Sequence, residues 1–262
     1  MCYAPAPMTT WNPTQYLRFG NQRLRPALDL LARIPLDAPA NVYDLGCGPG
    51  TATVYLKARW PDAHVTGVDG SPEMLARARE EHADIDWQEA DLRSWQPETA
   101  PDLLYSNATL HWLGDHETLF PRIASLLGDG GVLAVQMPRN FGEPSHTTIF
   151  DTIRAHDWVD RLLPLLDERP THEPTFYYDL LRPHFATLDV WETQYYQVME
   201  GEHSIVEFTK GSYLRPILNT LDEGEAQAFL CEYAERVGPS YPRRPDGTTL
   251  LPFRRLFIVA TR

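Results

Sequence analysis

The segment of the sequence richest in chemistry is DLGCGPG at residues 44–50. It places Gly46, Gly48 and Gly50 at every second position, shortly after the acidic Asp44. Glycine lets a backbone pass close to a ligand and turn sharply into a helix, whose first N–H groups stay available to that ligand. An apolar run precedes the segment and a helical pattern follows it. The spacing therefore predicts a ligand-binding loop between a strand and a helix.

A second acidic residue, Asp69, ends the next apolar run, HVTGV, and lies 19 residues past Gly50. A carboxylate at the end of a second strand can accept hydrogen bonds from both hydroxyl groups of a ribose. Gly70 and Ser71 follow directly, and Ser71-Pro72 is a typical start for a helix. We therefore expect this segment to contact the same ligand.

The third and fourth apolar runs also end in polar loops. In an open α/β sheet the loops at the carboxyl ends of parallel strands meet at one edge, and ligands bind there. We expect further ligand contacts from these loops and from the helix after Asp69. The residues are Met74, Asp91, Leu92, Asn107, Ala108, His111 and Trp112.

Simpler structural interpretations exist for each of these residues. The glycines could serve turns, Asp69 could cap a helix, and Asp91 could be a surface acid. Asp44 could stabilise its own loop, while Met74 could be a core residue, and His111 and Trp112 ordinary helix residues. We interpret Cys47 as a small filler, because no His or Lys adjoins it to activate the thiol. The histidines lack the spacing of metal ligands, so no metal is expected.

The elements that must position these loops alternate between strand and helix. Such alternation predicts an α/β fold, a doubly wound and mostly parallel sheet with helices on both faces. The expected strands are 41–45, 64–68, 85–89, 101–106, 131–136 and 250–261, with a β-rich stretch at 185–199. We expect an N-terminal arm at 1–22 and one domain at 23–262, with a helical insertion at about 200–245.

Composition and charge exclude several classes of function. The 262 residues are 43% hydrophobic and 23% charged, which is the usual mix of a globular protein. A formal net charge of −13 disfavours nucleic acid as a partner. We find no signal peptide and no apolar run near the roughly 20 residues that span a bilayer. With three widely spaced cysteines, these features favour a cytoplasmic protein without membrane partners. The oligomeric state stays open.

Taken together, the motifs resemble those of the class I S-adenosylmethionine-dependent methyltransferases. The matching segments are YDLGCGPG at 43–50, GVDGSPEML at 67–75, EADL at 89–92 and SNATLHWL at 106–113. The resemblance implies S-adenosylmethionine as cofactor and S-adenosylhomocysteine as product. It implies that the glycine loop holds the methionine part, Asp69 the ribose and Asp91 the adenine amino group. It also implies a Rossmann-like seven-stranded sheet with an antiparallel last strand.

Three competing classes fit the sequence less well. A nicotinamide dehydrogenase would carry G-x-G-x-x-G, whereas Gly50 comes one residue early here. A base-modifying amino methyltransferase would carry Asn/Asp-Pro-Pro-aromatic after the fourth strand, where this chain has Asn107-Ala108-Thr109-Leu110. A non-catalytic protein that senses the cofactor stays open.

Within this class the chain is similar to the trans-aconitate methyltransferases over nearly its whole length. The similarity includes segments outside the cofactor loops, such as WNPTQYL at 11–17, GSYLRPIL at 211–218 and RRLFIVATR at 254–262. It implies formation of the monomethyl ester of trans-aconitate, a tricarboxylate. A carboxylate is already ionised at pH 7 and needs no general base, so the enzyme must orient and desolvate it. No catalytic acid or base is therefore expected.

Binding the remaining carboxylates calls for arginine forks or tyrosine hydroxyls. The candidate substrate-binding residues are Arg215, Arg255, Tyr177 and Tyr195, with Trp11 and Tyr16 in a closing arm. Each could instead be a surface ion pair, a core aromatic or an arm anchor. The alternative activities are an O-methyltransferase for another small di- or tricarboxylic acid, and a methyltransferase for a small molecule without a carboxylate.

Overall fold

The computed structural model describes residues 20–166 and 171–262, which form two compact units. The first, here the sheet unit, comprises Asn21–Pro138, Thr171–Thr193 and Arg255–Arg262. The second, here the helical unit, comprises the described residues 139–166 and 194–254. Each unit is described separately. Trp11 and Tyr16 lie outside the described residues.

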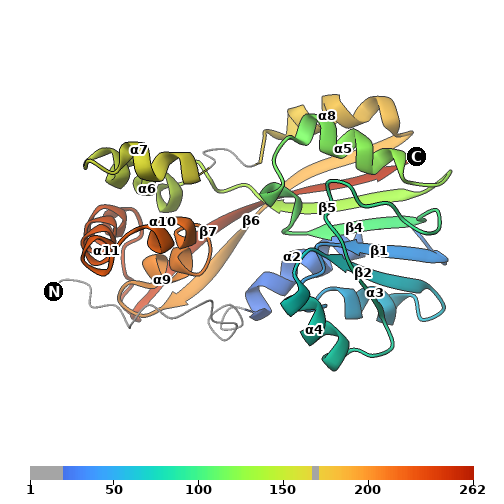
Figure 1. Cartoon of the computed structure of the whole chain (residues 1–262), viewed down its shortest axis with the longest axis horizontal. Helices are drawn as coiled ribbons and strands as arrows, with labels where there is room; N and C mark the ends of the chain where they lie inside the picture. The colour runs from blue at the N-terminus through green and yellow to red at the C-terminus, as the bar shows by residue number, and fades with distance from the viewer. Residues whose placement is uncertain (1–19, 167–170) are drawn as a thin grey trace. The chain divides into compact units, whose positions relative to one another are not determined.

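A seven-stranded sheet carries the fold, with the strand order β3-β2-β1-β4-β5-β7-β6 (Figure 1). The strands are β1 (Asn41–Leu45), β2 (His64–Asp69), β3 (Asp86–Glu89), β4 (Leu103–Asn107), β5 (Val132–Pro138), β6 (Thr187–Glu200) and β7 (Thr248–Thr261). Strands β1 to β5 pair in parallel, whereas β7 runs antiparallel to β5. This arrangement confirms the expected fold class and the antiparallel strand near the C-terminus.

The central strands are continuous apolar runs because both of their faces are covered. All seven residues of β5 are buried, and so are four of the five in β1 and in β4. The helices of the sheet unit are α2 (Gly20–Ala32), α3 (Thr53–Arg59), α4 (Pro72–Glu81), α5 (His116–Ser125) and α8 (Pro174–Leu181). The short helices η1 (Leu110–Trp112) and η3 (Arg182–His184) complete this unit.

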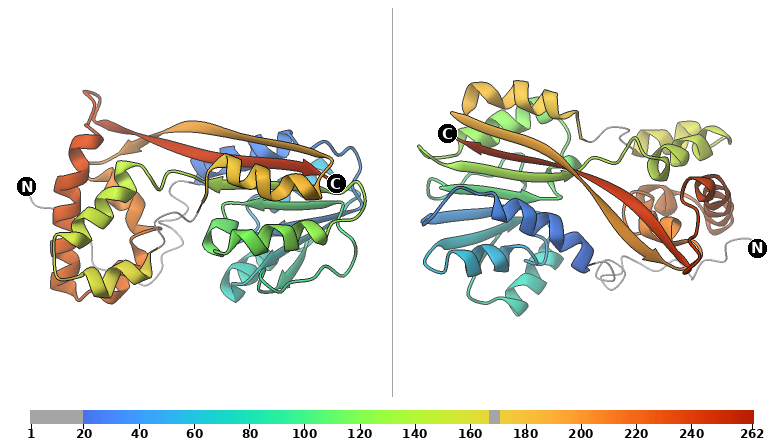
Figure 2. Two further views of the ribbon diagram at one scale, coloured as in Figure 1. Left: turned by 90° about the horizontal axis from the view of Figure 1, so that it is seen from above. Right: turned by 180° about the vertical axis from the view of Figure 1, so that it is seen from behind.

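Side chains alternate between the two faces of the sheet, and each face has its own helices. Leu104 and Ile258 share a buried cluster with residues of α5 and α8. Tyr105 points to the opposite face, where its hydroxyl donates to the carbonyl oxygen of Ala27 in α2 at 2.9 Å. Seen from behind, α2 lies in front of the strands and α5 lies beyond them (Figure 2). Helices therefore cover both faces, as a doubly wound sheet requires.

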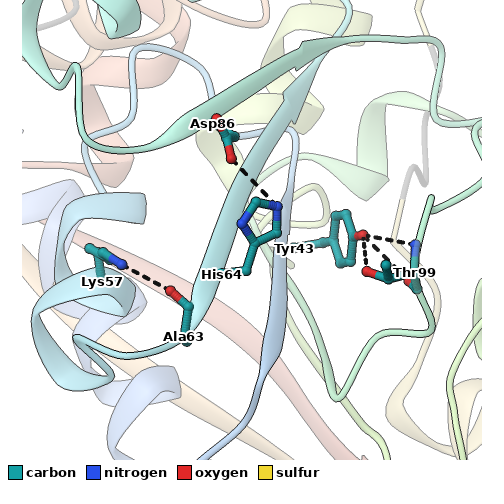
Figure 3. Close-up of polar contacts among 6 residues, drawn as sticks. All are labelled: Tyr43, Lys57, Ala63, His64, Asp86 and Thr99. Carbon is teal, nitrogen blue, oxygen red and sulfur yellow. Dashed lines mark hydrogen bonds and ion pairs between the residues drawn. The ribbon is translucent and has the colours of Figure 1, made fainter.

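Polar contacts fix strands β1 to β3 away from the loops at their carboxyl ends (Figure 3). The hydroxyl of Tyr43 lies 3.0 Å from the hydroxyl of Thr99. The imidazole of His64, the first residue of β2, lies 3.4 Å from the carboxylate of Asp86, the first residue of β3. The register that brings the carboxyl ends of the strands to one edge is set by the backbone pairing of β1 with β2 and of β2 with β3.

The helical unit has its own core. Its helices are α6 (Pro144–Arg154), α7 (Val159–Leu162), α9 (Ser204–Lys210), α10 (Arg215–Thr220) and α11 (Glu223–Val237), with the short η2 (Leu163–Leu165) and η4 (Gly238–Ser240). Asp222 and Glu225 form a reciprocal capping box that begins α11. Buried side chains of α6, including Ile149 and Ile153, share one cluster with Phe229 and Tyr233 of α11. The segment before β6 thus contributes to this unit together with the helices between β6 and β7.

Candidate functional site

The glycine loop, residues 46–50, connects the end of β1 to the start of α3 through a left-handed backbone. Gly46 has φ +78°, and a β-carbon there would lie 2.0 Å from Cγ2 of Thr109. Gly48 has φ +56°, and a β-carbon there would meet nothing within 4 Å. Gly46 therefore serves close packing within the protein, whereas Gly48 faces open space that a ligand can enter.

Asp69 at the end of β2 holds the glycine loop in place. One carboxylate oxygen accepts from the amide of Gly48 at 2.8 Å, and the other accepts from the amide of Ser71 at 2.8 Å. Ser71 also caps α4, since its hydroxyl accepts from the amide of Met74 at 3.4 Å. A carboxylate oxygen has two acceptor sites, so one protein bond at each leaves room for ligand hydroxyls.

Asp44 lies beneath the same loop and is only 1% exposed. The hydroxyl of Thr53 donates to its carboxylate at 2.7 Å. Burial raises the pKa of Asp44 to about 7, and the negative charge of Asp69 adds to this effect. A cation bound nearby would lower the pKa of Asp44 and so oppose both effects. Two neighbouring carboxylates thus make this end of the site suited to a positively charged ligand.

Cys47 is buried inside the loop and close to both carboxylates. Burial first, and the charges of Asp44 and Asp69 next, raise the pKa of its thiol far above the usual range. A thiol in this environment stays protonated and is a poor nucleophile. Its role is to fill space beside Gly67, whose added β-carbon would lie 2.9 Å from the sulfur.

The loop after β3 contains Asp91 and Leu92. The side chain of Asp91 is 56% exposed, and its carboxylate accepts from the amide of Arg93 at 2.9 Å. Leu92 is buried, and its carbonyl oxygen accepts from the guanidinium group of Arg122. The same guanidinium donates to the carbonyl oxygen of Trp95 at 2.9 Å, so one side chain of α5 holds this loop.

The loop after β4 has an unusual backbone. Ala108 adopts φ +56°, a left-handed conformation that costs a residue with a β-carbon about 1–2 kcal/mol. Such strain is found preferentially at functional sites. Its amide donates to the carbonyl oxygen of Gln136 in β5 at 2.8 Å, which holds the turn. The Thr109 hydroxyl donates to the carbonyl oxygen of Gly46 at 3.0 Å, so the loops after β1 and β4 are joined.

The η1 helix follows this loop and is anchored through its carbonyl oxygen at Leu110. Nε2 of the buried His116 lies 3.0 Å from that oxygen, and Nδ1 lies 2.7 Å from the hydroxyl of Tyr177. Because a carbonyl oxygen only accepts, Nε2 of His116 carries a proton. The amide of His172 donates to the same hydroxyl at 3.1 Å. Tyr177 is fully buried, and these contacts describe a supporting role for a residue that we expected at the substrate.

The part of the site next to the loop after β4 is basic. Arg255 is 5% exposed, and its guanidinium group donates to Oε1 of the buried Gln136 at 3.5 Å. His111 is also buried. Burial first, then the positive charges of Arg255 and His116, hold the pKa of His111 well below its usual range. At neutral pH this part therefore carries the charge of Arg255 beside a neutral imidazole.

The remaining expected site residues have different environments. Met74 is half-buried, Gly70 is exposed, and Trp112 is 56% exposed beside the ring of His111. Arg215 is exposed at the start of α10 and Tyr195 is buried in β6, both in the helical unit. Arg215 and Tyr195 thus belong to a different unit from the loops of the site, and their expected roles at the substrate stay predictions.

Sequence reasoning missed three contributors to the site. Gln136 is a polar residue near the end of an otherwise apolar strand, and that contrast could have revealed it. Thr109 and His116 are less conspicuous, because their contacts with Gly46 and Tyr177 span 63 and 61 positions of the sequence. No local sequence pattern predicts contacts between residues so far apart in the sequence. Among the described residues, no group of three His, Cys, Asp or Glu side chains could hold a metal ion.

A doubly wound sheet with paired acids around a glycine loop after β1 defines the class of S-adenosylmethionine-dependent methyltransferases. Residues 42–131 match a family model described as a methyltransferase domain. The YcgJ protein from Bacillus subtilis has a similar structure, with a TM-score of 0.57 at 15% identity, covering 91% of this chain and 98% of that one. At that identity the likeness supports the fold alone.

More specific relatives come from sequence. The chain is 48% identical to trans-aconitate 2-methyltransferase from Azoarcus sp. strain BH72, over 97% of this chain and all of the relative. It is 45% identical to the enzyme of the same name from Escherichia coli O7:K1, over 97% and 99% of the two chains. The chain belongs to the family of the trans-aconitate 2-methyltransferases. S-adenosylmethionine is the methyl donor of this family.

Proposed function

We propose that this protein transfers a methyl group from S-adenosylmethionine to one carboxylate of trans-aconitate and forms a monomethyl ester. The observation that supports the proposal is the charge division of the site, with Asp44 and Asp69 around the glycine loop and Arg255 beside Gln136 and near His111. The acidic part suits a cationic cofactor and the basic part suits an anionic substrate. The names of the full-length relatives supply the particular acid.

The residues present fit the cofactor. Asp44 is a buried acid whose raised pKa a cation would relieve, and Oδ1 of Asn107 is a buried acceptor that makes no hydrogen bond to any described group. When bound, the cofactor supplies an electrophilic methyl group on a sulfonium ion. We assign contacts with it to three loops and to the turn into α4. The residues are Asp44, Gly46, Gly48, Gly50, Asp69, Gly70, Ser71, Met74, Asp91, Leu92, Asn107, Ala108, His111 and Trp112.

For methyl transfer the protein must bind, align and desolvate a nucleophile that is already ionised. A carboxylic acid has a pKa near 4 to 5, so at pH 7 its carboxylate needs no base. Arg255 is placed to hold a carboxylate of the substrate, and burial around it strengthens that interaction. Alignment of the attacking oxygen with the methyl carbon then accounts for catalysis by proximity and orientation.

His111 bears on the competing activities. An enzyme that methylates nitrogen or carbon usually needs a group that removes a proton near the sulfonium. His111 is a titratable base in the assigned site that lies close enough to Arg255 to feel its charge, and its lowered pKa makes it a weak base. This favours a carboxylate acceptor. Another small di- or tricarboxylic acid is the alternative substrate, since Arg255 would recognise any such anion.

Substrate contacts from Arg215, Tyr195, Trp11 and Tyr16 are part of the proposal as expected from the sequence. The partner is thus a small tricarboxylate, and we propose the cytoplasm as its location. Among the described residues, no helix is long and apolar enough to cross a bilayer. Neither of the described cysteines, Cys47 and Cys231, forms a disulfide, which is usual in a reducing compartment.

The product identifies the reaction. Purified protein is incubated with S-adenosylmethionine and trans-aconitate, and the acid fraction is analysed by mass spectrometry before and after mild alkaline treatment. We expect one added methyl group, which alkali removes as methanol. A methylated product that resists alkali would contradict ester formation and would redirect the proposal to an N- or C-methyl acceptor.

A further inference from the structure

Three side chains share one face at the carboxyl ends of β4 and β5. Asn107 is the partner of Gln136 in the parallel register, and Pro138 is the partner of Arg255 in the antiparallel register. Paired residues point to the same face, as do residues two apart in one strand. Asn107, Gln136 and Arg255 therefore project from adjoining strands on one side of the sheet, within the sheet unit.

Gln136 has a fixed orientation and one unsatisfied donor. Arginine only donates hydrogen bonds, so the amide oxygen of Gln136 must be the atom that faces Arg255. Its Nε2 group is consequently turned away from the guanidinium. Gln136 is fully buried, and this Nε2 makes no hydrogen bond to any described group. Buried donors in native proteins are almost always paired, so this position calls for an acceptor.

The surroundings specify the charge of that acceptor. Arg255 is buried beside Gln136, and a second positive charge is disfavoured nearby, since burial first and the charge of Arg255 next lower the pKa of His111. A cation would meet repulsion, and a neutral group would gain little from the guanidinium. An anion with two oxygens would accept from Nε2 and interact with the guanidinium at the same time.

We propose that Gln136 and Arg255 form a carboxylate subsite, which binds a carboxylate of the substrate other than the one that is methylated. Gln136 is the specificity-determining member, because it donates to the anion and also orients the guanidinium. The identity of the anion as part of a tricarboxylate rests on the proposed function. The subsite itself rests on the geometry of β4, β5 and β7.

Two substitutions at Gln136 test the subsite in the whole protein. Gln136→Met keeps the length and burial of the side chain but removes the hydrogen-bond donor. Gln136→Glu places a carboxylate of the protein next to Arg255, where it takes the place of the substrate carboxylate. The probes are tricarballylate and its trimethyl ester, a tricarboxylate and an uncharged molecule of the same backbone. Calorimetry measures their affinity for protein saturated with S-adenosylhomocysteine. Gln227→Met on α11 is the control, since Gln227 is a half-buried glutamine of the helical unit.

We expect the unmodified protein and Gln227→Met to bind tricarballylate more tightly than its trimethyl ester. Gln136→Met should weaken the binding of tricarballylate about 10- to 100-fold with little change for the uncharged ester, as expected for a lost hydrogen bond to a charged group. Gln136→Glu should abolish the preference. Both variants should keep their affinity for S-adenosylhomocysteine, which reports that the sheet unit is folded.

An unchanged ratio of the two affinities in both Gln136 variants would overturn the subsite, and so would an unmodified protein that binds tricarballylate and its uncharged ester equally. The outcome for the proposed function is separate. If no acid is methylated but the preference depends on Gln136, the subsite stands and the proposed reaction fails. If Gln136→Met, Gln136→Glu and Gln227→Met all methylate trans-aconitate with the KM of the unmodified protein, the proposed reaction stands and the subsite fails.

Discussion

The carboxylate of Asp69 accepts a hydrogen bond from the amide of Gly48 at 2.8 Å, across 21 positions of the sequence. The end of β2 thereby sets the shape of the glycine loop after β1, because Gly48 has a left-handed backbone that the bond stabilises. The second carboxylate oxygen accepts from Ser71 and holds the turn into α4. One side chain thus organises the two loops that we assign to the cofactor.

Replacing Asp69 should remove cofactor binding. Asp69→Asn keeps the shape but cannot accept from two amides and two ribose hydroxyls at once, so we expect about a 100-fold loss of affinity for S-adenosylhomocysteine. Isothermal titration calorimetry measures the Kd. Asp86→Asn is the control, since this exposed acid begins β3 and pairs with the exposed His64. Equal affinity in both variants would contradict the assignment of Asp69.

The glycine loop offers a stability comparison between neighbouring glycines. Gly46→Ala forces a β-carbon against Thr109 in a left-handed backbone, so we expect a loss of about 2–5 kcal/mol in the free energy of unfolding. Gly48→Ala meets no neighbour and should lose about 1–2 kcal/mol from the backbone alone. Urea denaturation measures both. The free energy of cofactor binding should nevertheless fall by more in Gly48→Ala than the free energy of unfolding does. An unchanged cofactor Kd in this variant would contradict the assignment of Gly48 to the cofactor site.

Asp44 predicts a pH dependence of stability in the cofactor-free protein. Its pKa of about 7 in the folded state lies above the ordinary value of 3.8 for an aspartate, so the folded state holds the proton more tightly. The resulting stabilisation is complete below about pH 4 and is lost as pH rises to about 7, by about 4 kcal/mol. Urea titrations from pH 4 to 8 should show this slope, and Asp44→Asn should reduce it. An identical slope in the variant would show that other groups cause it.

The same residue predicts proton release when the cofactor binds. A positively charged amino group near Asp44 would lower its pKa, so at pH 6 binding should expel up to one proton, and at pH 8.5 none. Calorimetry in buffers of different ionisation enthalpy counts the protons. Asp44→Asn should release fewer at pH 6. Release that persists in full in this variant would place the titrating group elsewhere.

Tyr177→Phe separates support of the site from general stability. Loss of the hydroxyl removes the bond to His116 and should cost about 1 kcal/mol, as should Tyr233→Phe, which loses a buried bond to Ser145 in the helical unit. Only Tyr177→Phe should weaken cofactor binding, because His116 anchors η1. Equal cofactor affinity in the two variants would confine Tyr177 to a structural role.

The sheet was predictable because its strands carry continuous apolar runs. Residues 41–45 were expected as a strand and form β1 with the same bounds, while β4 ends one residue later than expected, at Asn107. The loops could be predicted as well, since Gly46, Gly48 and Asp69 follow those strands. Local sequence contains this information, because burial on both faces and left-handed turns restrict the residues that fit.

The basic part of the site was less predictable. Arg255 was a candidate, yet its partner Gln136 is 119 positions away, and only the register of β5 with β7 brings them together. Tyr177 was expected at the substrate from its type alone, whereas its hydroxyl is engaged by His116 in the core of the sheet unit. Contacts made by tertiary packing leave no periodic pattern in the sequence. A tyrosine can therefore be buried and hydrogen-bonded where its residue type alone suggests an exposed, ligand-binding side chain.

Selective methyl transfer tests the central claim most directly. The protein is incubated with S-adenosylmethionine carrying a radiolabelled methyl group, and trans-aconitate, cis-aconitate, isocitrate and citrate are compared side by side. We predict strong labelling of trans-aconitate in a base-labile ester, weak labelling of the other acids, and loss of activity in Arg255→Leu with the cofactor Kd intact. Absence of label in every acid, in protein that binds the cofactor, would contradict the proposed substrate while leaving the methyltransferase fold in place.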